Sequence, residues 1–131
     1  MVVLEPSLAR GVPFLRRQSL QLASKMRFIS TQLSALLTDE LWRTNAAHAN
    51  AMARRLAEGV STLPGVEITY PVESNAVFAS LPEKATAALQ ERYLFHVWDE
   101  HTGVVRWMTA FDTSPAQVDD FIEDIERHLN A

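Results

Sequence analysis

The chain has 131 residues, 47% of them hydrophobic and 21% charged, which fits one ordinary globular domain and excludes disordered or collagen-like chains. A formal net charge of −4 leaves no excess of positive charge to neutralise phosphates, which argues against nucleic-acid binding. The lack of cysteine excludes disulfides and thiolate chemistry, and no apolar run approaches the roughly 18 residues needed to cross a membrane.

The first predicted element is the apolar run MVVL at residues 1–4, typical of a buried strand in a parallel sheet. No strand follows it for some sixty residues, so we expect the rest of its sheet to lie outside this chain. The run lacks the charged flank and cleavage site of a signal peptide, which favours a cytoplasmic protein. Ser7 is expected to cap a short helical turn that ends at Gly11 and Pro13.

Two amphipathic helical runs over residues 14–63 form a predicted spine. The first repeats apolar residues at steps of three, four and seven, which predicts one helix with an apolar stripe. The second is expected to begin after a Thr38 cap and to end in the segment from Gly59 to Gly65. The stripe of the first run consists of Leu15, Leu22, Met26, Ile29, Leu33, Leu36 and Leu37.

The remainder of the chain predicts two strands, a helix, two more strands and a last helix. This ββαββα order indicates an α+β domain in which an antiparallel sheet has two helices on one face. Thr113 or Ser114 is expected to cap the last helix, with Pro115 in its first turn. The predicted strands cover residues 66–70, 75–81, 93–98 and 104–109, and the first of the two helices covers residues 82–92.

The apolar pattern predicts one compact core in this domain and a separate stripe on the first helix without cover. The predicted core comprises Ile68, Val77, Phe78 or Ala79, Leu89, Phe95, Val97, Phe121, Ile122 and Ile125.

Arg106 stands in a predicted strand of apolar and aromatic residues, VVRWMT. An arginine there either points to solvent or needs an anionic partner, because burying an unpaired charge is costly. Its planar guanidinium matches a substrate carboxylate. The strand pattern alone favours the solvent-facing alternative, since exposed arginine is the ordinary case.

The other polar residues show no recognisable catalytic pattern. The four histidines have no metal-ligand spacing, which predicts no metal site. Lys25 and Arg27 belong to a basic segment of the first helix, which could contact a phosphate or an acidic partner or could simply be solvated.

The segments RRQSLQLASKMRFISTQLSALL and LWRTNAAHANAMARRLAEGV closely resemble the low-specificity L-threonine aldolases of the β-eliminating lyase group. The resemblance continues through NAVFASLP, FHVWDE and VVRWMTAFDTS in the family's order, and so covers essentially the whole chain. It implies the C-terminal part of a pyridoxal-phosphate enzyme of fold type I, related to aspartate aminotransferase. Residues 1–37 would then be a remnant of the large cofactor-binding domain, and residues 38–131 a linking helix with the small domain.

The same resemblance implies what the chain contains and lacks. The family's Schiff-base lysine stands in a Gly-Thr-Lys-Asn segment shortly before the strand that MVVLEP resembles, and this chain has no such segment. Arg106 matches the arginine that binds the carboxylate of the amino-acid substrate, which reverses the expectation from the strand pattern. Lys25 and Arg27 match basic positions near the cofactor phosphate or the subunit interface.

Two functions follow as expectations. The first is that the chain is part of an aldolase of amino acid metabolism, an enzyme that cleaves β-hydroxy-α-amino acids to glycine and an aldehyde. The chain itself would not bind pyridoxal phosphate covalently and would be inactive alone. The alternative is a non-catalytic module for oligomerisation or protein binding. In either case the chain is expected to form a homo-oligomer with the first helix at the interface, because the stripe on this helix exposes an apolar surface.

Overall fold

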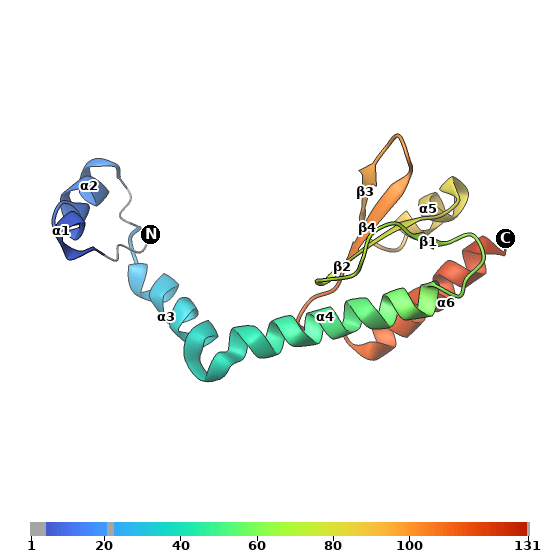
Figure 1. Cartoon of the computed structure of the whole chain (residues 1–131), viewed down its shortest axis with the longest axis horizontal. Coiled ribbons are helices and arrows are strands. Elements are labelled where there is room, and N and C mark those ends of the chain that lie inside the picture. The colour runs from blue at the N-terminus through green and yellow to red at the C-terminus, as the bar shows by residue number, and fades with distance from the viewer. Residues whose placement is uncertain (1–4, 21–22, 131) are drawn as a thin grey trace. The chain divides into compact units, whose positions relative to one another are not determined.

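The computed structural model describes residues 5–20 and 23–130, and the chain divides into two compact units, Met1–Leu41 and Trp42–Ala131 (Figure 1). The strand predicted at residues 1–4 and the stripe residue Leu22 lie outside the described residues. Each unit is described by itself below.

The first unit contains three short helices and a 3-10 turn instead of one long helix. The predicted continuous helix is wrong, because Leu20 and Lys25 adopt left-handed φ angles of 54° and 62° and interrupt it. Neither flanking helix buries a residue, and periodicity alone is too weak to hold a short helix without packing. The elements are α1 (Pro6–Ala9), α2 (Val12–Gln18), α3 (Met26–Leu37) and η1 (Thr38–Glu40).

The helix ends of the first unit also differ from the prediction. The carboxylate of Glu5, and not Ser7, caps α1 by accepting a hydrogen bond from the Ser7 amide at 3.0 Å. Pro13 lies in the first turn of α2, where proline is well tolerated, and so does not stop a helix. The Thr38 hydroxyl donates back to the Ser34 carbonyl at 2.8 Å, at the end of α3.

The apolar stripe on α3 is largely exposed, as the sequence predicts. Ile29, Leu33 and Leu36 are exposed, Met26 is half-buried, and Leu15 on α2 is exposed as well. Contiguous exposed apolar side chains of this kind are typical of a surface that contacts another chain or segment.

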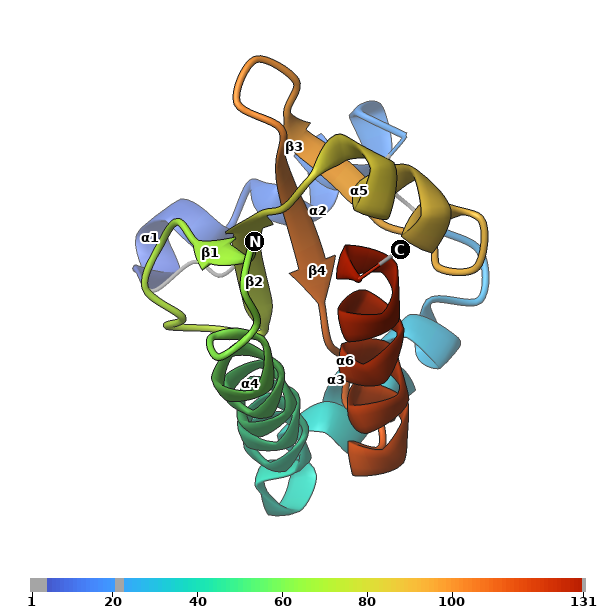
Figure 2. The ribbon, with the colours of Figure 1, turned by 90° about the vertical axis from the view of Figure 1, so that its right-hand side faces the viewer.

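The second unit has the predicted ββαββα order after one long helix, and its four antiparallel strands lie in the order β1-β2-β4-β3. Helices α4 and α6 run side by side across one face of the sheet (Figures 1 and 2). The elements are α4 (Leu41–Val60), β1 (Glu67–Ile68), β2 (Ala76–Ser80), α5 (Glu83–Gln90), β3 (His96–Asp99), β4 (Val104–Met108) and α6 (Pro115–Leu129).

Local chemistry fixes the start of α6 and its packing on α4. Ser114 forms a capping box with Gln117, in which each side chain accepts a hydrogen bond from the other residue's amide. Gly59 on α4 lets α6 approach closely, because a Cβ atom at this position would collide with Ile122. Arg55 and Asp119 join the two helices through two hydrogen bonds of 2.7 Å.

The core lies between the sheet and three helices, and not two, because α4 contributes Ala53, Leu56 and Val60. Val77, Ala79, Leu89, Phe95 and Ile125 are buried as predicted, and Ile68, Phe121 and Ile122 pack around them.

Two parts of the core prediction are wrong. Val97 is 37% exposed because β3 is an edge strand. Of the two alternatives Phe78 and Ala79, Ala79 is the core residue, and Phe78 points to the opposite face. Trp107, which the prediction omitted, is only 3% exposed and meets the rings of Phe95 and Phe121 edge to face.

A buried carboxylate ties α6 to the segment that follows α5. Asp124 is 2% exposed and accepts hydrogen bonds from the Tyr93 hydroxyl at 2.6 Å, from Arg92 and from Arg127. The bond from Tyr93 holds the pKa of Asp124 below that of an ordinary aspartate, and both arginines act in the same direction against the effect of burial. The stabilising effect of this hydrogen-bonded cluster therefore depends on the Asp124 carboxylate being ionised.

This cluster predicts acid sensitivity. Because the folded pKa of Asp124 is lowered, its contribution is complete above the ordinary aspartate pKa of about 4 and is lost as the pH falls through the folded value. Asp124→Asn should lower the urea midpoint at neutral pH and flatten its decline in acid. Some decline will remain, because the pKa values of Asp99 and Asp119 are also lowered. The exposed Asp120→Asn is the control, and an unchanged acid slope in Asp124→Asn would contradict the assignment.

Candidate functional site: the open face of the sheet

The sheet has one face packed on helices and one open face. Along β2 and β4, Val77 and Trp107 point to the helices, whereas Phe78 and Arg106 point the other way. Phe78 and Arg106 are direct cross-strand partners, and His96 on β3 is the partner of Arg106 on its other side. The open face thus carries a row of Phe78, Arg106 and His96 across three strands.

Arg106 lies at the centre of this row, half-buried and without an acidic partner. Among the residues that the structure describes, none forms a hydrogen bond or an ion pair with its guanidinium. Its Nε atom is buried without an acceptor, and its Cζ atom lies 4.9 Å from the centre of the Trp98 ring. Because the described residues offer its guanidinium no acceptor, this arginine is a candidate for binding an external anion through its terminal nitrogens.

Aromatic rings form the surroundings of Arg106. Tyr70 meets Phe78 edge to face at 5.4 Å between ring centres, and Phe78 meets Trp98 in the same way at 5.3 Å. Edge-to-face pairs at these distances are favourable and fix ring orientation. Tyr70 and Trp98 remain exposed, and so does Met108 further along β4. The open face is therefore an aromatic surface around one cation.

The turn between β3 and β4 follows directly after Trp98. Asp99 accepts hydrogen bonds from the His101 amide at 2.9 Å and from the Thr102 hydroxyl at 2.8 Å. The bond from Thr102 lowers the pKa of Asp99, and the bond from the His101 amide acts in the same direction. Gly103 completes the turn with a φ of 70°, which glycine adopts readily.

The other predicted residues do not belong to the strands that form this face. Lys25 and Arg27 belong to the first unit, where Lys25 is exposed in a left-handed turn and Arg27 stacks on Phe28 at 5.1 Å. His48 donates a hydrogen bond to the Thr113 carbonyl at 2.7 Å, which is a structural contact between α4 and the loop before α6. Within the described residues no cluster of potential ligands could hold a metal ion, and none of their helices is long and apolar enough to cross a membrane.

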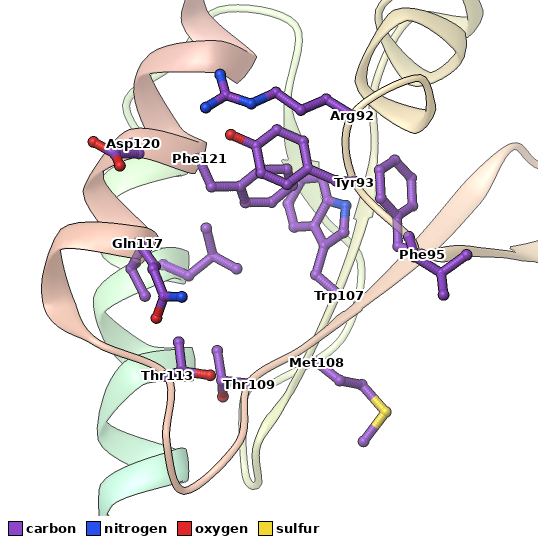
Figure 3. A pocket seen from close by; sticks show the side chains of 13 residues that line it. Arg92, Tyr93, Phe95, Trp107, Met108, Thr109, Thr113, Gln117, Asp120 and Phe121 are labelled. Atoms are coloured by element: carbon purple, nitrogen blue, oxygen red, sulfur yellow. The ribbon is translucent and has the colours of Figure 1, made fainter.

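A pocket of about 370 Å³ opens on the helical side of the same unit (Figure 3). Trp107, Tyr93 and Phe121 form its aromatic wall, and Thr109 and Gln117 lie on its polar side. Thr109 already donates to the Ala49 carbonyl, and Gln117 already serves the capping box. Its residues come from four separate segments of the chain, so no local motif could have indicated the pocket.

Comparison with known proteins confirms the resemblance seen in the sequence. The chain is 39% identical over 125 residues to the low-specificity L-threonine aldolases of Pseudomonas sp. and Pseudomonas aeruginosa. These alignments cover 95% of the chain and 36% of each relative, so the chain spans about a third of their length. A solved threonine aldolase of Leishmania major matches 75% of the chain and 29% of its own, with 25% identity and a TM-score of 0.66. No family model matches the chain.

Proposed function

We propose that this chain is the part of an L-threonine-aldolase-like lyase that binds the carboxylate of a small amino-acid substrate through Arg106. The relatives support the lyase family, and their names imply pyridoxal phosphate in the full-length enzyme. The observation that carries the proposal is Arg106 itself, a cation on an open sheet face to which the described residues supply no acceptor.

The geometry of Arg106 suits a carboxylate. Its Nε atom is buried, so the two terminal nitrogens are the donors left for a ligand. A planar pair of N–H donors binds both oxygens of one carboxylate and so fixes its plane as well as its position. In the cleavage of a β-hydroxy-α-amino acid to glycine and an aldehyde, this contact would orient the substrate for the bond that breaks.

The residues of the second unit do not fit the cofactor itself. Pyridoxal phosphate supplies electron-sink chemistry and is held through a lysine amine in such enzymes. The sequence contains two lysines, and Lys84 lies exposed at the start of α5, a helix on the packed side of the sheet. Lys25 belongs to the first unit. We therefore propose that the chain alone is catalytically inactive.

Inactivity has a direct test. After incubation with pyridoxal phosphate and reduction with borohydride, mass spectrometry should find no specific adduct at Lys25 or Lys84, and L-threonine should yield no glycine. A stoichiometric adduct together with aldol cleavage would disprove this part of the proposal. Lys25 and Arg27 remain proposed contacts to a cofactor phosphate or to another subunit.

Arg106→Ala should abolish carboxylate binding with little effect on folding. Acetate is the probe, followed in nitrogen-15 NMR spectra by the indole N–H resonance of Trp98, whose ring lies beside Arg106 and is still present in the variant. The free energy of unfolding should change by about 1 kcal/mol or less, as for a residue that supports no buried partner. Arg54→Ala on the exposed side of α4 is the matched control and should leave the acetate response unchanged. A loss of several kcal/mol in Arg106→Ala would show a structural role instead.

The second candidate function is assembly. We propose that residues 1–37 correspond to a remnant of a larger domain, that residues 38–131 form the linking helix and small domain, and that the first segment mediates homo-oligomerisation. The exposed leucine and isoleucine side chains of α3 support this candidate. The two candidates are compatible, since one chain can both bind a carboxylate and form an oligomer.

A further inference from the structure

Trp98 occupies an irregular position in the sheet. Val97 pairs with Val105 and Asp99 pairs with Val104, so Trp98 is an extra residue between two consecutive pairs, which is a β-bulge. A bulge changes the direction of a side chain and is common beside functional sites. This bulge lies next to the turn in which Asp99 accepts hydrogen bonds from His101 and Thr102.

The Trp98 ring faces two groups on the open face. It lies 4.9 Å from the guanidinium carbon of Arg106 and 5.3 Å from the centre of the Phe78 ring. Phe78 is the direct cross-strand partner of Arg106, so the backbone register places the two side chains that contact Trp98 next to each other on one face. Trp98 is 54% exposed, so its location is not explained by burial in the core.

We infer that Trp98 is a positioning residue for Arg106: by stacking on the guanidinium, it holds the two terminal nitrogens toward the open side of the sheet. The inference rests on the proposed role of Arg106 in carboxylate binding. An unsupported arginine samples many rotamers, and fixing it on binding a ligand costs conformational entropy. A ring that already holds the guanidinium removes part of that cost, because attraction between a cation and an aromatic face favours one arrangement.

The neighbouring groups do not provide this support. His96 lies beside Arg106 in the register, but a neutral imidazole offers a smaller ring and a protonated one repels the guanidinium. Phe78 meets Trp98 with its ring and so supports the tryptophan. Trp98 is the aromatic residue whose contact with the Arg106 guanidinium the structure records.

Nitrogen-15 NMR of the whole chain tests the inference. A proton above an aromatic ring is shielded, so the Nε–H resonance of Arg106, assigned by its loss in Arg106→Lys, should lie upfield of ordinary arginines. Trp98→Leu should remove this displacement and weaken acetate binding about fivefold, the size of a typical contact between a cation and a ring. Trp98→Tyr should retain most of both. Trp42→Leu, an exposed tryptophan on α4, is the control and should change neither.

The outcomes separate the inference from the function on which it rests. If Trp98→Leu binds acetate as tightly as the unsubstituted chain, Trp98 does not position Arg106, even if the upfield displacement of the Arg106 Nε–H resonance is lost in this variant. If acetate fails to move the Arg106 resonance of the unsubstituted chain while the upfield displacement is present, the carboxylate role is wrong and the positioning role is overturned with it. Should Trp98→Leu fail to fold, Trp98→Thr takes its place, because it also removes the ring and should show the same loss of shielding and of acetate affinity.

Discussion

Replacing Trp107 with alanine is expected to destabilise the second unit by about 3–5 kcal/mol, the range for removing a large aromatic side chain from a core. Trp107 is 3% exposed and meets Phe121 edge to face at 5.3 Å and Phe95 at 6.3 Å. The substitution leaves a cavity where the sheet meets α6. Because domains are stable by only about 5–15 kcal/mol, the loss removes a large share of the total.

Urea unfolding followed by circular dichroism measures this effect. Trp98→Ala is the matched control, since it removes the same side chain from the open face, where it is 54% exposed. Its cost should be about 1 kcal/mol or less, because surface substitutions and exposed cation–ring contacts have small effects. A larger loss in Trp98→Ala than in Trp107→Ala would mean that the two faces of the sheet have been assigned the wrong way round.

The second large effect concerns assembly. The unsubstituted chain is expected to sediment as a dimer or larger species, and Ile29→Glu with Leu33→Glu is expected to yield a monomer. Both side chains are exposed on α3, one helical turn apart. Burying each against a second copy stabilises the oligomer by roughly 1.5–3 kcal/mol. Two charges in their place should therefore weaken association by about a hundredfold or more.

Thr31→Glu with Ala35→Glu is the control, because this pair has the same spacing on the opposite side of α3 and adds the same charge. It should leave the sedimentation coefficient unchanged. If the unsubstituted chain already sediments as a monomer, with α3 protected from hydrogen exchange, the assembly proposal is wrong.

Patterns repeated over many residues predicted the fold best. Helix α6 has apolar residues at the helical period and a serine cap next to proline, and all of these signals agree. The segment before β3 shows why agreement matters. Its aromatic residues predicted a strand from residue 93, yet Tyr93 and Phe95 pack against Phe121 and the strand begins at His96. Tertiary packing outweighed local strand preference there.

The candidate site was predictable in part. The strand pattern left Arg106 with two alternatives, and the resemblance to the aldolases chose between them. Trp98 could not be identified from sequence, because its contact with Arg106 depends on a bulge in β3 and on the pairing of β3 with β4. The break in the first helix was equally hidden, since left-handed leucine and lysine residues carry no sequence signal of their own.

The strand order has a consequence for how this sheet can meet other chains. Its two outer strands are β1, with two residues, and β3, with four residues and a bulge. Short or bulged outer strands offer few free backbone groups and so resist strand addition, which limits edge-to-edge growth and aggregation. A partner that meets the sheet must therefore contact its broad surface, and the surface that the helices of the second unit leave uncovered is the one that carries Arg106 and Trp98.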